Sequence, residues 1–325
     1  MRDFRVLLTD LPWGHSDIER AGLAEIGAEA VIAPDGEEPT LIEHAAGVDA
    51  IATCWAKVTA RVLDSAPDCR IVARLGIGLD NIDVAGATER GIVVTNVPDY
   101  CVSEVADHTL ALLLAMARNV GFFHLRTKQG EYDLQSGRPV HRLSEQTLGL
   151  VGLGRIGRAV ATRARALGMT VLAHNRSGDD HGIGCEMLDL PTLLARSDYV
   201  SLHLPATGET EHLLNAGMLR HMRRGARLIN TSRGALVDPA ALRDALQQER
   251  LGGAALDVFE PEPPDLTHPL YRDERVIVTP HAAFVSVESV DELRRRVMAQ
   301  VVAVLRGVTP ENVVNSEVLT RRGNA

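Results

Sequence analysis

Residues 147–157 read Thr-Leu-Gly-Leu-Val-Gly-Leu-Gly-Arg-Ile-Gly, and the rest of the chain is interpreted outward from this stretch. Residues 148–151 are apolar and predict a short buried strand, while the run 158–167 after the glycines is typical of a helix. A strand, a glycine turn and a helix in this order are what a dinucleotide site requires. A glycine turn that only packs a helix on a strand is the simpler alternative, and the flanking elements favour the nucleotide interpretation.

Each glycine of the turn has a separate predicted task. Gly152 makes the tight turn, Gly154 lets a pyrophosphate approach the backbone, and Gly157 lets the helix pack closely on the strand. The free N–H groups and the positive end of the helix dipole at 155–157 would then hold the phosphates.

Composition excludes several classes of protein. A chain of 325 residues can form two domains, and a net charge of −9 argues against a general nucleic-acid binder. The longest apolar run, 110–117, is too short to span a bilayer, and the charged first residues do not resemble a signal peptide. The four scattered cysteines predict neither a disulfide framework nor a metal site, which fits a reducing cytoplasm.

Short apolar strands alternate with helical stretches in the N-terminal third, and a more regular alternation begins at residue 147. The last long helix, 287–305, is expected to return to the first domain. The fold prediction is therefore α/β, with two Rossmann-like domains, doubly wound parallel sheets and an active-site cleft between them. Residues 1–101 with 286–325 form the predicted substrate-binding domain, and 102–285 form the predicted dinucleotide-binding domain.

A helix with Ser103 as its N-cap is predicted over 103–119. It is apolar on nearly every side, so we expect it to be buried between domains or subunits. His108 on this helix is interpreted as a core or interface histidine. Residues 120–146 are polar and glycine-containing, and are expected to form an irregular linker or dimer arm.

Three polar stretches, 229–238, 256–263 and 278–284, follow predicted strands of the second domain, so they should line one crevice. They supply Arg233, Glu262 and His281, a set that suits oxidation of a 2-hydroxy acid. Arg233 can pair with a carboxylate or polarise the C2 oxygen, and His281 can take up the hydroxyl proton. Glu262 would orient the imidazole and favour its protonated form. Taken singly, each residue has a simpler interpretation: Arg233 as a surface arginine, Glu262 as a solvated loop acid and His281 as the cap of a strand end.

The sequence resembles the D-isomer-specific 2-hydroxyacid dehydrogenase family over essentially its whole length. The motifs that carry this resemblance are RLGIGLDNID (74–83), GLGRIG (152–157), LINTSRGALVD (228–238), ALDVFEPEP (255–263) and TPHAAF (279–284). The resemblance implies that Arg233, Glu262 and His281 are the catalytic trio and that Asp257 meets the nicotinamide amide. It also implies that the loop Leu75, Gly76, Ile77 and Gly78 cradles the substrate carboxylate through backbone N–H groups.

Asp99–His108, Arg74 and His281–Phe284 are similar to the branch that contains the C-terminal binding proteins. By this analogy Arg74 is a second anion contact, with a structural salt bridge as the alternative.

Position 175, where the family usually has an acid that holds the adenine ribose, is Asn175, and Arg176 could pair with a 2′-phosphate. NADPH is therefore the expected cofactor, with NAD the alternative. The predicted cofactor-binding residues are Gly152, Gly154, Arg155, Ile156, Gly157, Asn175, Arg176, Ser177, Leu204, Pro205, Thr210, Thr231, Ser232, Asp257, His281 and Ala283.

The predicted function is NAD(P)-dependent reduction of a small 2-keto acid such as glyoxylate or hydroxypyruvate, which yields the D-hydroxy acid. The alternative is a dinucleotide-sensing binding protein with little turnover, as the corepressor resemblance suggests. A homodimer formed through 103–119 and 120–146 is expected, with no nucleic acid, membrane or metal partner.

Overall fold

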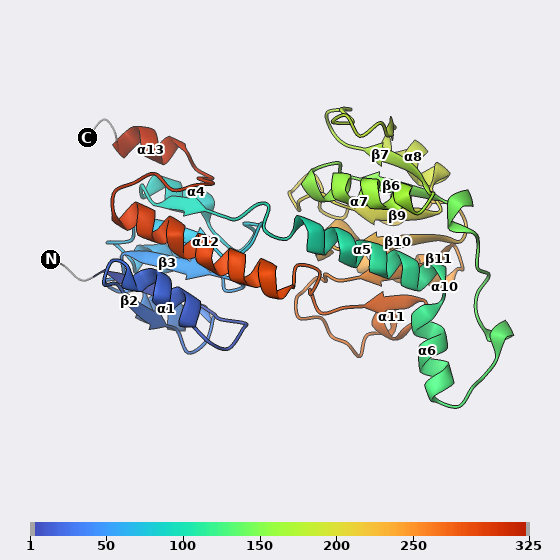
Figure 1. Ribbon diagram of the computed structural model, residues 1–325, viewed down its shortest axis with the longest axis horizontal. Coiled ribbons are helices and arrows are strands. Elements are labelled where there is room, and N and C mark those ends of the chain that lie inside the picture. Colours follow the sequence, from blue (N-terminus) through green and yellow to red (C-terminus); the bar gives the residue numbers. More distant parts are fainter. Residues whose placement is uncertain (1–3, 323–325) are drawn as a thin grey trace. The chain divides into compact units, whose positions relative to one another are not determined.

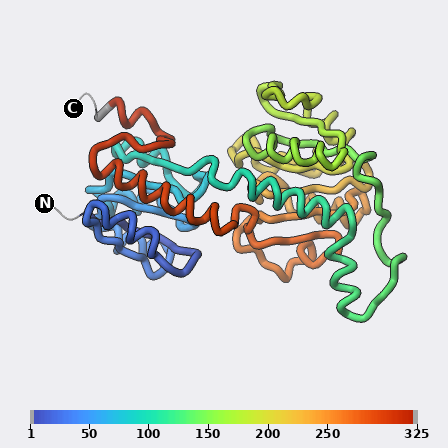
Figure 2. The backbone as a smooth tube through the Cα atoms, viewed as in Figure 1, coloured from blue at the N-terminus to red at the C-terminus, as the bar shows by residue number. Residues whose placement is uncertain are grey.

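The computed structural model describes residues 4–322, which divide into two compact units (Figure 1). The first unit combines the chain up to Tyr100 with the segment from Ser286 onward, and the second is Cys101–Val285. In Figure 2 the chain leaves the first unit after Tyr100 and returns to it at Ser286, just before the orange-red helix of residues 287–305.

The first unit is built on a five-stranded parallel sheet with the order β2-β1-β3-β4-β5. Strands β3 and β4 are buried along their whole length, as expected for parallel strands covered on both faces. Its strands are β1 Arg5–Leu8, β2 Glu29–Ile32, β3 Ala50–Thr53, β4 Ile71–Arg74 and β5 Val93–Thr95. Its helices are α1 Asp17–Ala24, α2 Glu38–His44, α3 Ala60–Asp64, α4 Val84–Glu89, α12 Val287–Leu305 and α13 Glu317–Arg322.

The second unit contains a seven-stranded parallel sheet with the order β12-β11-β10-β9-β6-β7-β8. The strand order reverses between β6 and β9, and a doubly wound sheet binds its ligand at this reversal. The strands are β6 Thr147–Val151, β7 Thr170–His174, β8 Glu186–Met187, β9 Tyr199–Leu202, β10 Ala226–Asn230, β11 Leu251–Leu256 and β12 Val276–Val278. The helices are α5 Val102–Ala117, α6 Val120–Lys128, α7 Arg155–Ala166, α8 Leu190–Arg196, α9 Ala216–Leu219, α10 Pro239–Gln247 and α11 Pro269–Arg272.

Both faces of the second sheet are covered by helices. Leu148 and Leu150 of β6 pack in a cluster with α5 and α7, which lie side by side (Figure 1). Val151 points the other way, into a cluster with α8 and α10. This alternation explains why an uninterrupted apolar run such as 148–151 is stable only as a strand between two helical layers. The prediction of two parallel-sheet α/β domains is confirmed.

Several local predictions were wrong or incomplete. Ser103 is not the N-cap of α5, which begins at Val102, and its hydroxyl instead accepts a hydrogen bond from Arg163 Nη2 at 2.8 Å. Residues 120–146 are not wholly irregular, because α6 and two short 3₁₀ turns form within them. The helix after the glycines begins at Arg155, one turn before the predicted run, because Gly154 ends the turn in an extended conformation.

Other predictions are confirmed. The last long helix, α12, spans Val287–Leu305 as expected. Asp238 caps α10 by accepting hydrogen bonds from the N–H groups of Ala240 and Ala241. Within residues 4–322, no helix combines the length and the apolar character needed to cross a membrane.

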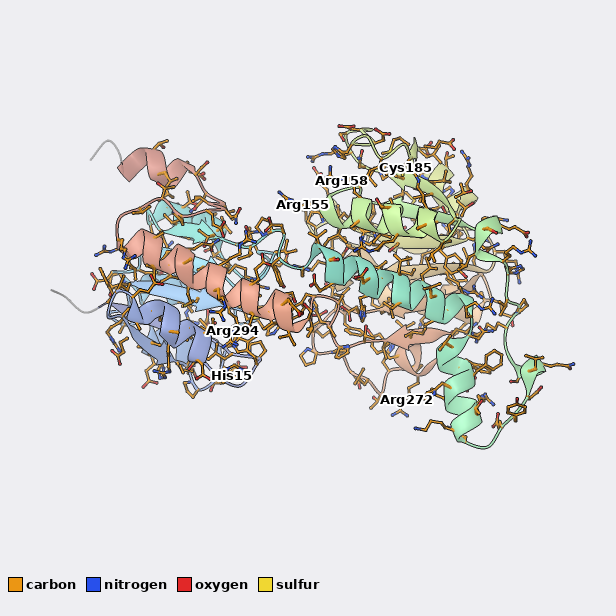
Figure 3. All side chains as sticks on the ribbon, in the orientation of Figure 1. His15, Arg155, Arg158, Cys185, Arg272 and Arg294 are labelled. Carbon is orange, nitrogen blue, oxygen red and sulfur yellow. The ribbon has the colours of Figure 1, made fainter. Side chains whose placement is uncertain are left out.

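A buried ion pair joins α1 to α12 in the first unit. Arg294 and Glu19 are 1% and 0% exposed and form two hydrogen bonds of 2.7 Å. Arg294 also donates to the His15 carbonyl at 3.0 Å and lies 5.0 Å from the Trp13 ring centre (His15 and Arg294 are labelled in Figure 3). This network connects α12 to α1 and to the loop before it, which carries Trp13 and His15.

We expect Glu19→Gln to lower the free energy of unfolding by about 3–5 kcal/mol, because it leaves a buried guanidinium without a counter-charge. The double variant Glu19→Leu/Arg294→Met should lose much less, since neither charge remains. Urea denaturation measures both. Asp291→Asn, which removes an exposed ion pair on the same helix, is the control and should cost under about 1 kcal/mol. Equal losses for Glu19→Gln and Asp291→Asn would contradict this account.

Candidate active site

The glycine turn after β6 leaves room for a ligand at one position and none at another. A Cβ on Gly157 would lie 2.3 Å from the carbonyl oxygen of Gly152, so only glycine allows α7 to begin this close to the strand. A Cβ on Gly154 would meet nothing within 4 Å. Arg155 and Arg158 extend from the first turn of α7, at its positive end (Figure 3). This open backbone beside a helix N-terminus fits the pyrophosphate of a dinucleotide.

The turn after β7 is shaped by Asn175. Its Oδ1 accepts from the Gly178 N–H at 2.7 Å and from the Ser177 hydroxyl at 3.2 Å, and its Nδ2 donates to the Asp179 carbonyl at 2.7 Å. Arg176 is 96% exposed in its side chain, and its Nη1 lies 4.0 Å from Glu209 Oε2. Asn175 therefore builds the turn, and it leaves the guanidinium of Arg176 in solvent.

His203, directly after β9, was not among the predicted site residues. A Cβ on Gly152 would lie 2.2 Å from the His203 carbonyl oxygen, so this histidine packs directly against the glycine turn. Its Nε2 lies 2.9 Å from the Ser201 hydroxyl, and burial lowers the pKa of His203 to about 4. The only signal in the sequence was its place at the carboxyl end of a strand. The neighbouring loop is held by Thr210, whose hydroxyl donates to the Pro205 carbonyl at 2.8 Å.

The segment after β10 brings Arg233 to the sheet edge. The Ser232 hydroxyl donates to the Leu202 carbonyl at 2.6 Å, and Thr231 is buried with its hydroxyl 2.9 Å from that of Thr109. Arg233 donates from Nη1 to the Ser232 carbonyl at 2.7 Å. A Cβ on Gly234 would lie 2.0 Å from the Phe259 carbonyl, so glycine here lets the Arg233 segment touch the loop that carries Glu262.

Glu262 and His281 form a direct pair. Glu262 Oε2 lies 2.8 Å from His281 Nδ1, and Glu262 Oε1 accepts from the Phe259 N–H at 2.7 Å. Burial of the Glu262 carboxyl acts to raise its pKa. The hydrogen bond and charge of His281, the Phe259 N–H and the charge of Arg233 outweigh burial and lower that pKa. The structure thus brings the three predicted side chains together, with Glu262 ionised at neutral pH.

The backbone of His281 is left-handed, with φ of +52°. This conformation costs about 1–2 kcal/mol for a residue with a Cβ, so its surroundings must hold it. Asp257 does so from the end of β11. It is fully buried, and its two oxygens accept from the N–H groups of Ala282 and Ala283, each at 2.9 Å.

Asp257 also accepts from the Thr279 hydroxyl at 2.5 Å, and that hydroxyl lies 3.1 Å from His108 Nε2. His108 is therefore more than a core histidine, because it belongs to the network that fixes the His281 segment. Helical position alone could not reveal this contact, which joins residues 171 positions apart. The expected contact of Asp257 with a nicotinamide amide stays a prediction.

In the first unit, the predicted substrate residues form the loop after β4. The Leu75 N–H donates to the Thr53 carbonyl at 2.8 Å and so continues the β-ladder. Arg74 is 7% exposed, and its Nε donates to the Gly78 carbonyl at 2.9 Å. Its guanidinium also bonds the Leu75 carbonyl and lies 5.9 Å from the Trp55 ring centre.

Comparison with known proteins agrees with this geometry. The family model described as the NAD binding domain of D-isomer specific 2-hydroxyacid dehydrogenases matches residues 110–283. A glyoxylate reductase of Korarchaeum cryptofilum is 41% identical over 290 residues, which are 87% of each chain. The chain belongs to the D-isomer specific 2-hydroxyacid dehydrogenase family.

Solved structures of the family share the fold. The NADPH-dependent glyoxylate/hydroxypyruvate reductase of Sinorhizobium meliloti, in complex with NADP and malonate, superposes with a TM-score of 0.86 at 32% identity. That match covers 96% of this chain and 97% of the reductase. D-lactate dehydrogenase of Aquifex aeolicus, complexed with NAD and lactic acid, gives a TM-score of 0.85 at 28% identity and covers 97% of both chains.

Family membership confirms the predicted reaction class. The chain is an NAD(P)-dependent oxidoreductase that acts on the CH–OH group of 2-hydroxy acids, and its cofactor is a nicotinamide dinucleotide. The glycine turn suits this cofactor because Gly154 faces open space at the start of α7. Membership in the branch of the C-terminal binding proteins remains a prediction.

Substitutions at Gly154 and Gly157 should separate an effect on cofactor affinity from an effect on the free energy of unfolding. Gly154→Ala is expected to leave the free energy of unfolding within about 1 kcal/mol and to weaken NAD(P)H binding at least about tenfold, because the added methyl fills the approach to the backbone. Gly157→Ala should instead destabilise the second unit by about 1–3 kcal/mol, because its Cβ overlaps a backbone carbonyl. Fluorescence titration with NADPH and urea denaturation distinguish the two. Normal cofactor affinity in Gly154→Ala would exclude this path for the pyrophosphate.

Proposed function

We propose that this dehydrogenase reduces small 2-keto acids of the glyoxylate and hydroxypyruvate class to the D-2-hydroxy acids. The observation that carries the proposal is the Glu262–His281 pair at 2.8 Å, with Arg233 close enough to lower the pKa of Glu262. An imidazole, a carboxylate and a guanidinium are the groups that reduction of a 2-keto acid needs. The similarity to glyoxylate reductases supports the substrate class.

In the proposed mechanism, a bound nicotinamide supplies the hydride for the substrate C2. His281 donates a proton to the C2 oxygen as this oxygen becomes an alkoxide. Glu262 accepts a hydrogen bond from Nδ1, which aims Nε2 at the substrate. Arg233 stabilises negative charge on the substrate carboxylate or on the C2 oxygen. In the oxidative direction His281 takes the proton back.

The proposed substrate-binding domain is the first unit, through the loop after β4. Among residues 4–322, the N–H groups of Gly76, Ile77 and Gly78 donate to no acceptor, whereas the Leu75 N–H is engaged by Thr53. Successive backbone N–H groups without a protein acceptor are the donors with which loops bind anions. We assign the substrate carboxylate to these three groups.

A panel of glyoxylate, hydroxypyruvate and pyruvate, each with NADH and NADPH, tests the function by the absorbance of the cofactor. Arg233→Ala should lower kcat/KM at least about a hundredfold, because it removes the electrophilic group, and should leave cofactor affinity nearly unchanged. Arg223→Ala, which removes an arginine paired with Asp198 in the same unit, is the control and should stay within about twofold. Tight cofactor binding without turnover of any acid would favour the dinucleotide-sensing alternative, and full activity in Arg233→Ala would remove Arg233 from the mechanism.

We also propose a preference for NADPH. Asn175 presents no carboxylate to repel a 2′-phosphate, and the exposed Arg176 can pair with one. Glu209 lies 4.0 Å from Arg176 and would compete with the phosphate for the guanidinium. The similarity to an NADPH-dependent reductase supports this choice.

The ratio of kcat/KM for NADPH to that for NADH measures the preference. Arg176→Ala should lower this ratio about tenfold, since it removes one charged hydrogen bond to the phosphate. Glu209→Gln should raise the ratio, because the guanidinium is then available to the phosphate. Comparable Michaelis constants for both cofactors in the wild type would contradict the preference.

A homodimer through α5, α6 and the segment up to residue 146 remains part of the proposal. Val120, Leu125 and Leu134 expose more than half of their surface, which a second copy would cover. A cytoplasmic location is likewise proposed from the four cysteines, which are all free and buried.

A further inference from the structure

The loop Leu75–Gly78 has every carbonyl group engaged. The donors are Arg74 Nη1 to Leu75, the Val97 N–H to Gly76 at 3.1 Å, Asn96 Nδ2 to Ile77 at 2.7 Å, and Arg74 Nε to Gly78 at 2.9 Å. Two side chains and one backbone amide of the first unit therefore set the orientation of four successive carbonyls.

Fixing these carbonyls also fixes the N–H groups. A peptide unit is planar and trans, so the N–H of one residue points opposite to the carbonyl of the residue before it. The bound carbonyls of Leu75, Gly76 and Ile77 thus direct the N–H groups of Gly76, Ile77 and Gly78 away from the protein donors. These are the same three N–H groups that find no acceptor among the described residues.

Arg74 acts here as a loop support. A Cβ on Gly76 would lie 2.8 Å from Arg74 Nη1, so the guanidinium occupies the space that a side chain at position 76 would need. Its Nε and Nη1 are directed at the loop carbonyls. These hydrogen bonds to the loop explain why an arginine is buried beside the proposed anion cradle. They do not require Arg74 itself to contact the anion.

Asn96 is the donor to the Ile77 carbonyl, the third of the four carbonyls. It follows β5, and its own carbonyl accepts from Gln300 Nε2 of α12 at 2.9 Å. Gln300 is 1% exposed, so Asn96 is anchored from the interior of the unit. Its amide nitrogen is the donor that the structure provides for the Ile77 carbonyl, and hence it sets the direction of the Gly78 N–H.

We propose that Asn96 is a positioning residue for substrate binding: its side-chain amide orients the Ile77–Gly78 peptide so that the Gly78 N–H meets the substrate carboxylate. This inference rests on the proposed assignment of the cradle. Loss of the amide lets the peptide rotate, which weakens the grip on the carboxylate. The catalytic trio stands on other segments, so the effect falls on KM and much less on kcat.

Two substitutions of Asn96, whose effects on KM should differ in their pH dependence, test the proposal. In Asn96→Asp a carboxylate oxygen replaces the amide donor and repels the Ile77 carbonyl, so KM for glyoxylate should rise about tenfold at neutral pH with kcat within about twofold. A protonated aspartic acid can donate again, so the ratio of variant to wild-type KM should shrink as the pH falls. In Asn96→Ala no donor returns at any pH, and the ratio should stay raised throughout.

Asn81→Asp is the matched control. Its amide donates to the carbonyls of Cys54 and Ala56 in the same unit, at 3.2 Å and 2.9 Å, and contacts no carbonyl of the loop 75–78. KM should remain within about twofold of the wild type, whatever the change in melting temperature. An equal rise in KM for this variant would show that general loosening of the unit explains the effect.

Binding of oxalate to the enzyme saturated with oxidised cofactor, measured by calorimetry, tests the cradle without turnover. Weaker oxalate binding in both Asn96 variants supports the proposal, and wild-type affinity in both overturns it. If the wild type reduces no 2-keto acid but binds oxalate, and both Asn96 variants bind oxalate more weakly, the proposed function fails while the role of Asn96 stands. If the wild type does not bind oxalate, the cradle and the role of Asn96 both fall.

Discussion

Parallel strand pairing is the constraint on which the remaining features depend. Every strand of the second sheet runs in the same direction, so all the segments that leave carboxyl ends emerge at one edge. This edge carries, in chain order, the glycine turn, the Asn175 turn, His203, the Arg233 segment, Asp257 and the His281 segment. An antiparallel sheet would divide these segments between its two edges.

His281, the proposed proton donor, is held in place by a neighbouring carboxylate. A histidine with φ of +52° is held against its own backbone preference, and a fully buried carboxylate with two backbone N–H partners holds it. A buried Asp257 is stable only because each of its oxygens is satisfied. The same rule governs the pair of Glu19 and Arg294, in which two charges far from solvent are kept by each other. Both networks show buried polar groups used to fix a conformation.

Two places in the described chain, one in each unit, have backbone N–H groups that donate to no protein acceptor. At the start of α7 the first N–H groups have no acceptor within the helix, and a Cβ on the neighbouring Gly154 would meet nothing within 4 Å. After β4, N–H groups are directed outward because their neighbouring carbonyls are all engaged. Backbone amides carry no charge that titrates and have little freedom to move. In the proposed function they would give an anion fixed partners and leave proton transfer to His281.

The fold class, the reaction class and the three side chains of the candidate trio were all predictable from patterns along the chain. Apolar runs at strand length and the glycine spacing of 152–157 are local signals, and local signals are readable because they follow from backbone sterics and periodicity. Helix capping was harder to predict: Asp238 caps α10 as expected, whereas the Ser103 hydroxyl accepts a hydrogen bond from Arg163, 60 residues away. Three contacts could be found only in the folded chain: His108 reaches Thr279, His203 lies against the glycine turn, and Asn96 donates to the carbonyl of Ile77. Each of these contacts joins segments distant in the chain through a single hydrogen bond or a van der Waals contact. No periodicity or composition encodes such a contact, because it exists only after two independently formed elements have packed.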